Sequence, residues 1–311
     1  MTPNEITYAV FGIVLLIAIV FDLGLLSKGS KVMSMKKALW QTLFWVALAM
    51  AFFVFMWYEK GHTTALEYLS AYLMEWSLSI DNIFVFILIF TFFKIPATHY
   101  ARALLIGILM AIIFRIIFIT VGVALVSKFS WILYIFGVIL VWTGIKIFRA
   151  GEDEEFNPAE SPVYKLVNRF FPVAADDTSG KFTIMRDGKR YFTNMFVVII
   201  VLATTDIVFA LDSIPAVFAI SQERLVIYTS NIFAVLGLRS LFFLLRGAVA
   251  KFEYLQQGIA IVLIFIGFKM LIEYFHVHVP ILVSLMMILV CLGGSVVYSL
   301  QVARRRAKSE E

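Results

Sequence analysis

The chain of 311 residues is 62% hydrophobic and 15% charged, with a mean hydropathy of +0.94, whereas soluble domains are about 45–50% apolar. This composition excludes a soluble protein, and apolar runs of roughly 20 residues favour membrane-spanning helices over the short alternating strands of a β-barrel. The net charge of +5 does not indicate a nucleic-acid partner, because the basic residues follow membrane topology. The single cysteine, Cys291, excludes a disulfide framework and a thiolate metal site and argues against redox chemistry.

Apolar runs in chain order predict an all-α polytopic membrane protein with about nine transmembrane helices. The first run has no Lys or Arg before it and several lysines after it, which is the reverse of a cleavable signal peptide. We therefore expect it to remain as a helix with its N-terminus outside. The expected spans are about 6–26, 38–58, 66–92, 101–125, 130–149, 193–219, 225–245, 253–274 and 279–301.

Lys and Arg are distributed unevenly over the segments that connect these spans. With the N-terminus outside, 19 of the 26 Lys and Arg fall in segments expected inside the cell and 3 in segments expected outside. An excess of cations on the inner side is typical of multi-pass membrane proteins. The pattern predicts a cytoplasmic C-terminus.

The long polar connection at 150–192 is expected on the cytosolic side. It contains Asp187-Gly188 between two strand-like runs, and both residues of such a pair accept the positive φ that a two-residue hairpin turn requires. The sequence therefore predicts a small β-hairpin in this loop. The alternative is a disordered linker.

The regions on either side of this loop repeat one another. The runs K128-F-S-W-I-L-Y-I-F-G-V-I-L-V-W-T-G-I-K146 and K251-F-E-Y-L-Q-Q-G-I-A-I-V-L-I-F-I-G-F-K269 share their spacing from Lys to Gly-x-Lys. Residues 66–149 and 193–274 are therefore interpreted as two three-helix units. Since three is odd, the second unit must be inverted, as in many secondary transporters whose substrate site lies near the midplane. The flanking segments are two transmembrane helices in 1–65 and a last helix with a basic cytosolic tail in 275–311.

Each unit carries a pair of acids six residues apart, in E75-W-S-L-S-I-D81-N82 and in D206-I-V-F-A-L-D212-S213. Positions i and i+6 are about 120° apart on a straight helix, so we expect the two copies to converge about a pseudo-two-fold axis. A break or kink is predicted after the second pair, because Pro215 cannot donate a helical hydrogen bond. The candidate metal ligands are Glu75, Asp81, Asn82, Asp206, Asp212 and Ser213.

These oxygen donors suit Mg²⁺, Ca²⁺ or Mn²⁺ better than Zn²⁺ or Cu⁺. A charged side chain at the membrane centre costs about 2.5–3.5 kcal/mol on insertion scales, so the acids are expected to face a cavity or a partner. The alternative is that they only neutralise the cations within the spans. Those cations are Arg115 and Arg239, expected as scaffold or gating residues, and Lys146 and Lys269, expected to reach the interface.

Three further polar positions are left open by the residues alone. Asp22 is either a peripheral ion stop or an acid that reaches the interface. His276 and His278 lie near the outer end of the eighth span, where a solvated interfacial pair is favoured over a metal site.

The chain resembles the TerC family of integral membrane proteins, and its Alx branch in particular. The matching stretches include E75-W-S-L-S-I-D-N-I-F-V, T205-D-I-V-F-A-L-D-S-I-P-A and T229-S-N-I-F-A-V-L-G-L-R-S-L-F-F-L-L. The resemblance implies a manganese exporter of the bacterial inner membrane, with the family's acids at Glu75, Asp81, Asp206 and Asp212. It adds Asn231 and Asp22 to the supporting or gating residues. At 203, where relatives often carry Glu, this chain has Ala203.

The expected function is a secondary transporter that exports a divalent cation, Mn²⁺ by the resemblance, in exchange for protons. Export against 100 mV costs roughly 4.6 kcal/mol for a dication, and the chain has no Gly-x-x-x-x-Gly-Lys-Ser/Thr phosphate loop for ATP. No enzymatic activity and no cofactor are expected; the partners are the metal substrate, protons and membrane lipid. The alternatives are a membrane factor that assists metalation or assembly of other membrane and secreted proteins, and an intramembrane aspartyl protease, whose Gly-x-Gly-Asp element is absent.

Overall fold

The computed structural model describes most of the chain, and the helices account for nearly all of it. The residues outside the description are 1–2, 27–32, 130, 150–163, 165–168, 170, 175–179, 187, 247–253, 276, 278 and 310–311. The long helices are α1 (Pro3–Leu26), α2 (Met35–Lys60), α3 (His62–Phe92), α4 (Tyr100–Lys128), α5 (Ile132–Arg149), α7 (Asn194–Ile220), α8 (Arg224–Leu245), α9 (Leu255–Ile272) and α10 (Ile281–Ser309). Short 3₁₀ turns follow at Ala97–His99 and Glu273–Phe275, and the strands are β1 (Val173–Ala174), β2 (Thr183–Arg186) and β3 (Lys189–Thr193).

The helical architecture confirms a polytopic all-α membrane protein. Within the described residues, seven helices are long and apolar enough to cross a membrane, namely α2, α4, α5, α7, α8, α9 and α10. The helices α1 and α3 are not among them. The count of nine membrane crossings therefore stays a prediction.

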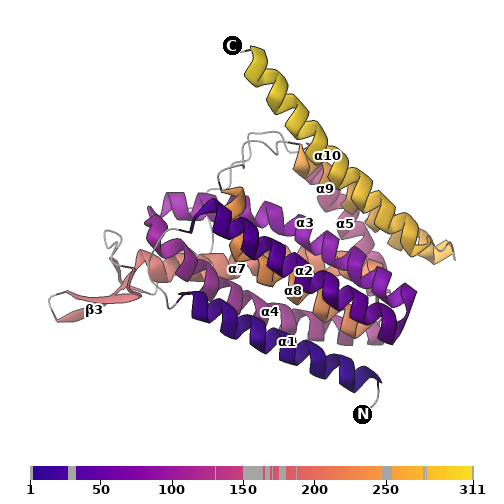
Figure 1. Ribbon diagram of the computed structural model, residues 1–311, viewed down its shortest axis with the longest axis horizontal. Helices are drawn as coiled ribbons and strands as arrows, with labels where there is room; N and C mark the ends of the chain where they lie inside the picture. Colours follow the sequence, from indigo (N-terminus) through magenta and orange to yellow (C-terminus); the bar gives the residue numbers. More distant parts are fainter. Residues whose placement is uncertain are drawn as a thin grey trace.

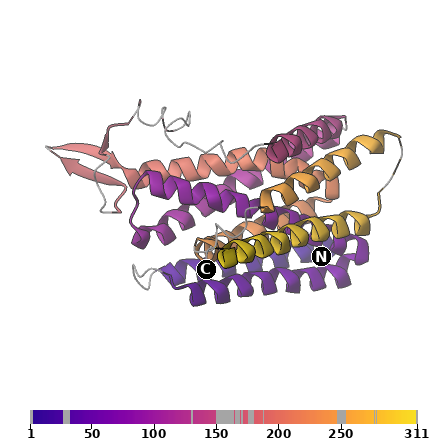
Figure 2. The same cartoon turned by 90° about the horizontal axis from the view of Figure 1, so that it is seen from above.

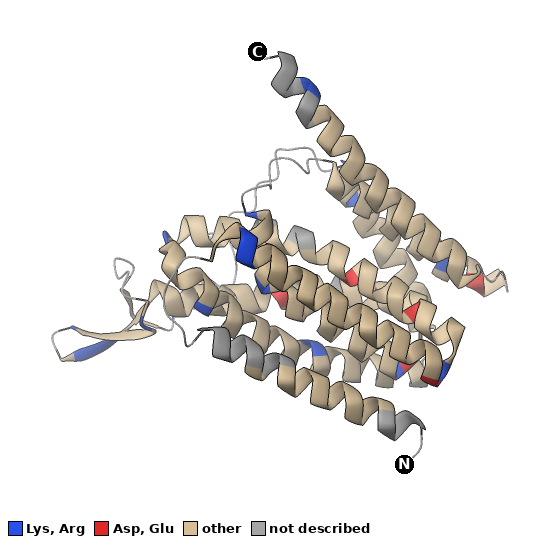
Figure 3. Cartoon of the chain, viewed as in Figure 1, with Lys and Arg blue, Asp and Glu red and all other residues tan. Residues whose placement is uncertain are grey.

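The helices form an elongated bundle with a second, oblique group against it (Figures 1 and 2). In Figure 1, α1 to α4, α7 and α8 run side by side, and α5, α9 and α10 lie across them at an angle. The β-strands project from one end, which we call the hairpin end, and α1 begins at the opposite end, which we call the far end. Lys and Arg gather around the hairpin end, whereas Asp and Glu lie within the bundle and toward the far end (Figure 3).

The helix α8 forms the centre of the bundle. Every residue from 229 to 243 is buried, and the helix packs against α2, α3 and α4. A helix that is covered on all sides can carry polar groups only if neighbouring helices satisfy them. Two such residues are Asn231 and Arg239, which are buried on α8 and therefore need polar partners from the neighbouring helices.

The oblique helices α5 and α9 cross at very short range through glycines. A Cβ added at Gly267 would lie 2.7 Å from the carbonyl oxygen of Gly137, and one added at Gly144 would lie 2.8 Å from that of Ala260. Gly137 of α5 meets Gly267 of α9, whereas Gly144, further along α5, meets Ala260, which comes earlier on α9. The two helices are therefore antiparallel. Gly144 and Gly267 are the glycines of the two Gly-x-Lys motifs, and the crossing gives the reason for them.

Of the break or kink predicted after Asp212, the break is wrong, and the kink stays a prediction. The helix α7 continues through Pro215 to Ile220, although proline removes one helical hydrogen bond. The turns around Pro215 are buried, and α7 packs against α3, α4, α5 and α9. Packing on several sides holds a proline-containing helix together within a membrane bundle.

A β-hairpin is present where the Asp-Gly pair predicted one. The strands β2 and β3 are antiparallel with Arg186 opposite Lys189, and Gly188 has a φ of 77°; residue 187 itself lies outside the described residues. The strand β1 adds in parallel to β3, so the strand order is β1-β3-β2.

The sheet is attached to the connection between α3 and α4. The guanidinium of Arg102 lies 4.7 Å from the centroid of the Phe182 ring and donates to the carbonyl oxygen of Gly180 at 3.4 Å. At the start of α7, Asn194 Nδ2 donates to the carbonyl oxygen of Phe93 at 3.3 Å. The strands therefore stand on the hairpin end of the bundle.

Candidate functional site

A buried arginine joins four helices near the middle of the bundle. Arg115 Nη1 of α4 donates to Glu75 Oε2 of α3 at 2.5 Å and to Asn231 Oδ1 of α8 at 3.0 Å. Its Nε and Nη2 donate to Asp206 Oδ2 and Oδ1 of α7 at 3.1 and 3.3 Å. We call these four residues the central cluster.

The side chains of the central cluster are buried, so their charges are not solvated by water and must be balanced by one another. Glu75 and Asn231 are 0% exposed, Arg115 is 1% exposed and Asp206 is 2% exposed. Removing Arg115 would leave two buried acids without their counter-charge, and the loss of one partner costs about 3–5 kcal/mol even in a simple buried pair. Two carboxylates and one guanidinium leave the described part of the cluster with one net negative charge.

Asn231 is oriented by its own helix. Its Nδ2 donates to the carbonyl oxygen of Ile227 at 3.0 Å, which turns Oδ1 toward Arg115. The residue lies in the run T229-S-N-I-F of α8, and its position supports the guanidinium rather than an acid. The family resemblance predicted Asn231 as a supporting or gating residue, but it did not indicate that its partner would be Arg115.

Several buried oxygens near the acids have no hydrogen-bond partner in the part of the chain that the structure describes. They are Glu75 Oε1 and the hydroxyls of Ser77, Ser79 and Ser213. Buried polar atoms are almost always paired, so such an orphan needs a specific explanation. A cation, which accepts lone pairs from oxygen, is one group that would satisfy them.

Two of the unpaired hydroxyls, those of Ser79 and Ser213, share a helix face with an acid of the central cluster. Glu75, Ser79 and Asn82 are at i, i+4 and i+7 on α3, and Asp206 and Ser213 are at i and i+7 on α7, so each set shares one face. Because α3 runs toward the hairpin end and α7 runs away from it, the two sets extend the polar zone in opposite directions from the central cluster.

Part of the predicted ligand set cannot be compared with the structure. The helices containing Asp22, Asp81 and Asp212 are described but these three side chains are not, and His276 and His278 lie outside the described residues. Asn82 and Ser213 are buried, with 3% and 2% exposure. No three described His, Cys, Asp or Glu side chains form a group that could hold a metal, so the cage of four carboxylates stays a prediction.

The central cluster assigns to Arg115 a larger part than the sequence indicated. Glu75 and Asp206 do converge from the two predicted repeats, but they converge on a guanidinium. The alternative interpretation, that the acids neutralise intramembrane cations, therefore describes these two acids in the conformation seen here. The sequence did show an arginine in the middle of a span in each predicted repeat. It did not show which acids each arginine would bind.

The lysines of the two Gly-x-Lys motifs lie in different surroundings. Lys146 is exposed, with its Nζ 6.0 Å from the centroid of the Trp142 ring, as expected for a side chain at the membrane interface. Lys269 instead lines a pocket at the far end of the bundle with a volume of about 200 Å³. The exposure of Lys146 agrees with the expected interfacial position, and for Lys269 that position stays a prediction.

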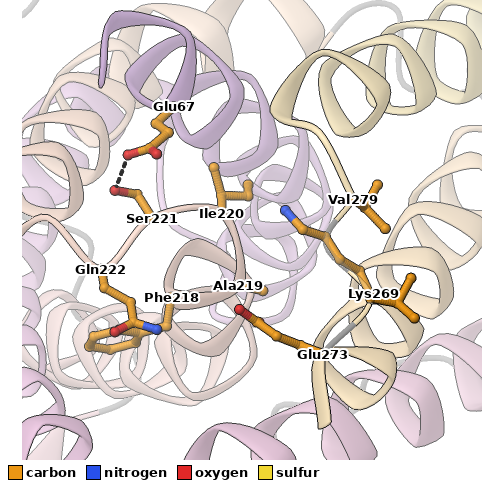
Figure 4. A pocket seen from close by; sticks show the side chains of 10 residues that line it. Glu67, Phe218, Ala219, Ile220, Ser221, Gln222, Lys269, Glu273 and Val279 are labelled. Atoms are coloured by element: carbon orange, nitrogen blue, oxygen red, sulfur yellow. Dashed lines mark hydrogen bonds between the residues drawn. The ribbon is translucent and has the colours of Figure 1, made fainter. Parts of the chain in front are cut away.

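The far-end pocket lies between α3, the end of α7 and the end of α9, and it is lined by charged and polar groups (Figure 4). Ser221 donates to Glu67 Oε2 at 2.5 Å. Lys269 and Glu273 point into the pocket from the α9 side, and Lys269 is attracted electrostatically to both Glu273 and Glu67. Sequence reasoning missed Glu67, although an acid eight positions before Glu75 on the same helix was a usable signal.

A second, much smaller cavity lies on the hairpin side of Asp206. Its volume is about 10 Å³, roughly the space for one water molecule. Apart from Asp206, its lining is apolar and includes Phe86, Leu104, Gly107 and Leu202. Beside Asp206, the described lining on the hairpin side is therefore apolar and leaves little space.

Comparisons with known proteins give the family context of this site. A family model described as the integral membrane protein TerC family matches residues 60–308. An uncharacterized membrane protein of Rickettsia felis is 41% identical over 94% of this chain and 97% of its own length, and one of Myxococcus xanthus is 42% identical over 93% and 90%. A relative from Escherichia coli, named as a proposed membrane-bound redox modulator, Alx, is 40% identical over 88% of both chains. No solved structure matches the chain.

Proposed function

Because the chain belongs to the TerC family of integral membrane proteins, we propose that it is a secondary transporter that exports a divalent metal cation, with Mn²⁺ as the substrate and protons as the exchanged ion. The observation that carries this proposal is the convergence of Glu75 and Asp206 from two helices at one fully buried point. Buried acids in a membrane protein are costly and commonly mark an ion pathway. The unpaired Glu75 Oε1, and the Ser213 hydroxyl about two turns from Asp206 on α7, supply further hard ligands.

We propose that the far end is the open side of the route, because the larger of the two cavities lies there. The far-end pocket of about 200 Å³ contains Glu67, which precedes Glu75 by eight residues on α3, or about 12 Å along the helix axis. Ser213 lies between Asp206 and the pocket residue Ser221 on α7. Toward the hairpin end the space beside Asp206 is about 10 Å³ and apolar. Such a state corresponds to one half of an alternating-access cycle.

An inverted repeat would supply the second half of that cycle. When the two Lys-to-Gly-x-Lys runs are aligned, Gly144 corresponds to Gly267 and Ala260 corresponds to Gly137. The close contact of Gly144 with Ala260 therefore corresponds to the close contact of Gly267 with Gly137. The α3–α8 and α4–α7 contacts form a second exchanged pair. We propose that these helices are two inverted copies and that rocking of one copy against the other closes the far end and opens the hairpin end.

Proton exchange follows from the chemistry of the acids. A carboxylate must give up its proton to bind a dication, so metal binding and proton release are coupled. Acids that face the outside would take up protons as metal leaves, and acids that face the cytoplasm would lose them as metal binds. One proton would cancel the single net negative charge of the central cluster.

Oxygen ligands also guide the choice between metal transport and redox chemistry. Carboxylate, amide and hydroxyl donors suit Mn²⁺, Mg²⁺ and Ca²⁺, and the family resemblance selects Mn²⁺ among them. The name of the Escherichia coli relative suggests redox modulation, but Cys291 is the single cysteine of this chain, and its Sγ contacts Met287 Sδ at 3.5 Å. Thiol–disulfide exchange within the chain is therefore excluded.

We place the protein in the bacterial inner membrane with the hairpin end in the cytoplasm. The relatives come from bacteria and are named membrane proteins, and the gathering of Lys and Arg at the hairpin end matches the positive-inside rule. The far-end pocket would then open to the outside and serve as the exit.

The decisive experiment uses the purified full chain in proteoliposomes that contain a Mn²⁺-sensitive dye. With the membrane potential clamped, an imposed proton gradient should drive Mn²⁺ accumulation, and Mn²⁺ added alone should move protons the other way. Liposomes with Asp206→Asn protein serve as the control and should show neither flux. Mn²⁺ flux that does not depend on the proton gradient would indicate a uniporter. Mn²⁺ binding without any flux would favour the metalation or assembly factor.

A further inference from the structure

Arg115 occupies the position at which a transported cation would contact both repeats. Its three guanidinium nitrogens reach Glu75, Asp206 and Asn231 at 2.5 to 3.3 Å. These partners are two carboxylates and an amide oxygen, the ligand types that hard divalent cations prefer. The guanidinium thus already fills a site made of cation ligands.

Arg115 cannot leave this site by losing its proton, because guanidinium stays charged in proteins at all physiological pH values. A metal bound to the same oxygens would lie about 2.0–2.6 Å from each of them, and therefore next to the guanidinium. Like charges repel strongly at that separation in a buried site. Metal and Arg115 can therefore occupy these oxygens only in turn.

The central cluster offers a starting point for such an exchange. Glu75 Oε1 is buried and accepts no hydrogen bond from the described residues, while Oε2 of the same carboxylate is held by Arg115. Ser79, one turn further along the same face of α3, is also buried and unpaired. A cation can contact these oxygens first and then displace the guanidinium from Oε2.

We infer that Arg115 is a tethered competitor of the transported cation: it holds Glu75 and Asp206 together when the site carries no metal and must be displaced for metal to bind. This inference rests on the proposed function and deepens it. Because Arg115 joins an acid of each proposed repeat, its displacement also breaks the described link between them. Metal binding and the freedom of the repeats to move are thereby coupled through one side chain.

The inference predicts an unusual order of metal affinities. Asp206→Asn should weaken Mn²⁺ binding at least about tenfold, since it removes a ligand and leaves the competitor in place. Arg115→Gln should bind Mn²⁺ at least about tenfold more tightly than the wild type and transport it more slowly, because nothing displaces the metal. Arg115→Lys, which keeps the charge but loses the fork of donors, should fall between them.

The double variant with Arg115→Gln and Asp206→Asn distinguishes a competitor from a structural residue. It has one acid and no guanidinium, so it keeps the net charge of the wild-type cluster and avoids two unpaired buried acids. If Arg115 competes with metal, this variant should bind Mn²⁺ at least as tightly as the wild type although it lacks Asp206. If Arg115 only maintains the fold, it should bind no better than Asp206→Asn.

The measurement is titration of each purified full-length variant with Mn²⁺, followed by the loss of the free-ion electron paramagnetic resonance signal. Size-exclusion chromatography and thermal melting identify folded protein, and Lys146→Gln controls for loss of one positive charge away from the site. Equal affinities of the wild type and Asp206→Asn would refute the proposed metal site and this inference together. Loss of affinity in Asp206→Asn without recovery in the double variant would refute the inference alone, and this comparison decides the matter even if Arg115→Gln does not fold.

Discussion

Glu75 of α3 and Asp206 of α7 bind the same guanidinium, that of Arg115, from two different helices. Glu75 accepts one hydrogen bond from Arg115, at 2.5 Å, whereas Asp206 accepts one on each of its two carboxylate oxygens. Two acids that occupy corresponding positions in the sequence are thereby placed at one point. We expect the stability of the fold and the proposed transport both to depend on this point, and they can be tested separately.

Asp206→Ala should destabilise the folded protein strongly. Truncation leaves Nε and Nη2 of the buried Arg115 without their acceptors, and an unsatisfied buried donor costs about 1–3 kcal/mol of unfolding free energy, or more when it is charged. Asp206→Asn keeps the shape and an oxygen acceptor for the guanidinium, so its cost should be smaller. Thermal melting in detergent compares the two variants, and equal melting temperatures for Asp206→Ala and the wild type would contradict the importance of the pair.

Asp81→Asn and Asp212→Asn should each abolish transport while the protein still inserts and folds. Each substitution removes a charge and keeps the side-chain shape, and both positions lie on the helices that carry the central cluster. Glu59→Gln, at an exposed position near the end of α2, serves as the matched control and should leave Mn²⁺ flux unchanged. Wild-type flux from either folded aspartate variant would remove that residue from the proposed site.

Gly107→Ala should slow transport without harming the fold. The added Cβ would lie 3.5 Å from Leu202 Cβ, an ordinary contact, and would fill the cavity of about 10 Å³ beside Asp206. We expect stability within about 1 kcal/mol of the wild type and flux lower by roughly tenfold, because an apolar constriction without room for water blocks ions. Gly12→Ala, which has open space around its Cβ, is the control; equal flux in both variants would place the pathway elsewhere.

Lys269→Gln should make export more sensitive to Mn²⁺ outside. The amino group faces two carboxylates in the far-end pocket, and without it the pocket attracts dications, which then occupy the exit. The external concentration that halves export should fall by about threefold to tenfold. Lys146→Gln, at the corresponding lysine of the first proposed repeat and exposed on α5, should leave that concentration unchanged. Identical behaviour of the two variants would argue against the pocket as the exit.

Local patterns in the sequence were sufficient to predict the elements. Apolar length and the Lys and Arg distribution indicated a polytopic helical protein, because a helix must satisfy its own backbone in lipid. The Asp187-Gly188 pair predicted the hairpin that β2 and β3 form. The shared Gly-x-Lys spacing pointed to Gly144 and Gly267, whose close approach to backbone oxygens tolerates no side chain.

Predictions that depended on contacts between helices fared less well. The continuity of α7 through Pro215 depends on neighbours that pack around it, and a proline by itself signals only the lost hydrogen bond. Glu67 was not recognised, since its importance comes from Ser221 and Lys269, which are distant in the chain and close in the pocket.

The sequence by itself determined which residues had to find partners, because Glu75, Arg115 and Asp206 lie in spans where an isolated charge is too costly to bury. Only the tertiary structure decided which of them meet. Helical periodicity relates positions within one helix, but a hydrogen bond of about 3 Å between helices depends on their crossing and relative height, which α8 at the centre of the bundle sets. For the same reason, the equivalent lysines Lys146 and Lys269 lie at a surface and in a pocket, respectively: equal spacing along the chain does not make the neighbouring helices equal.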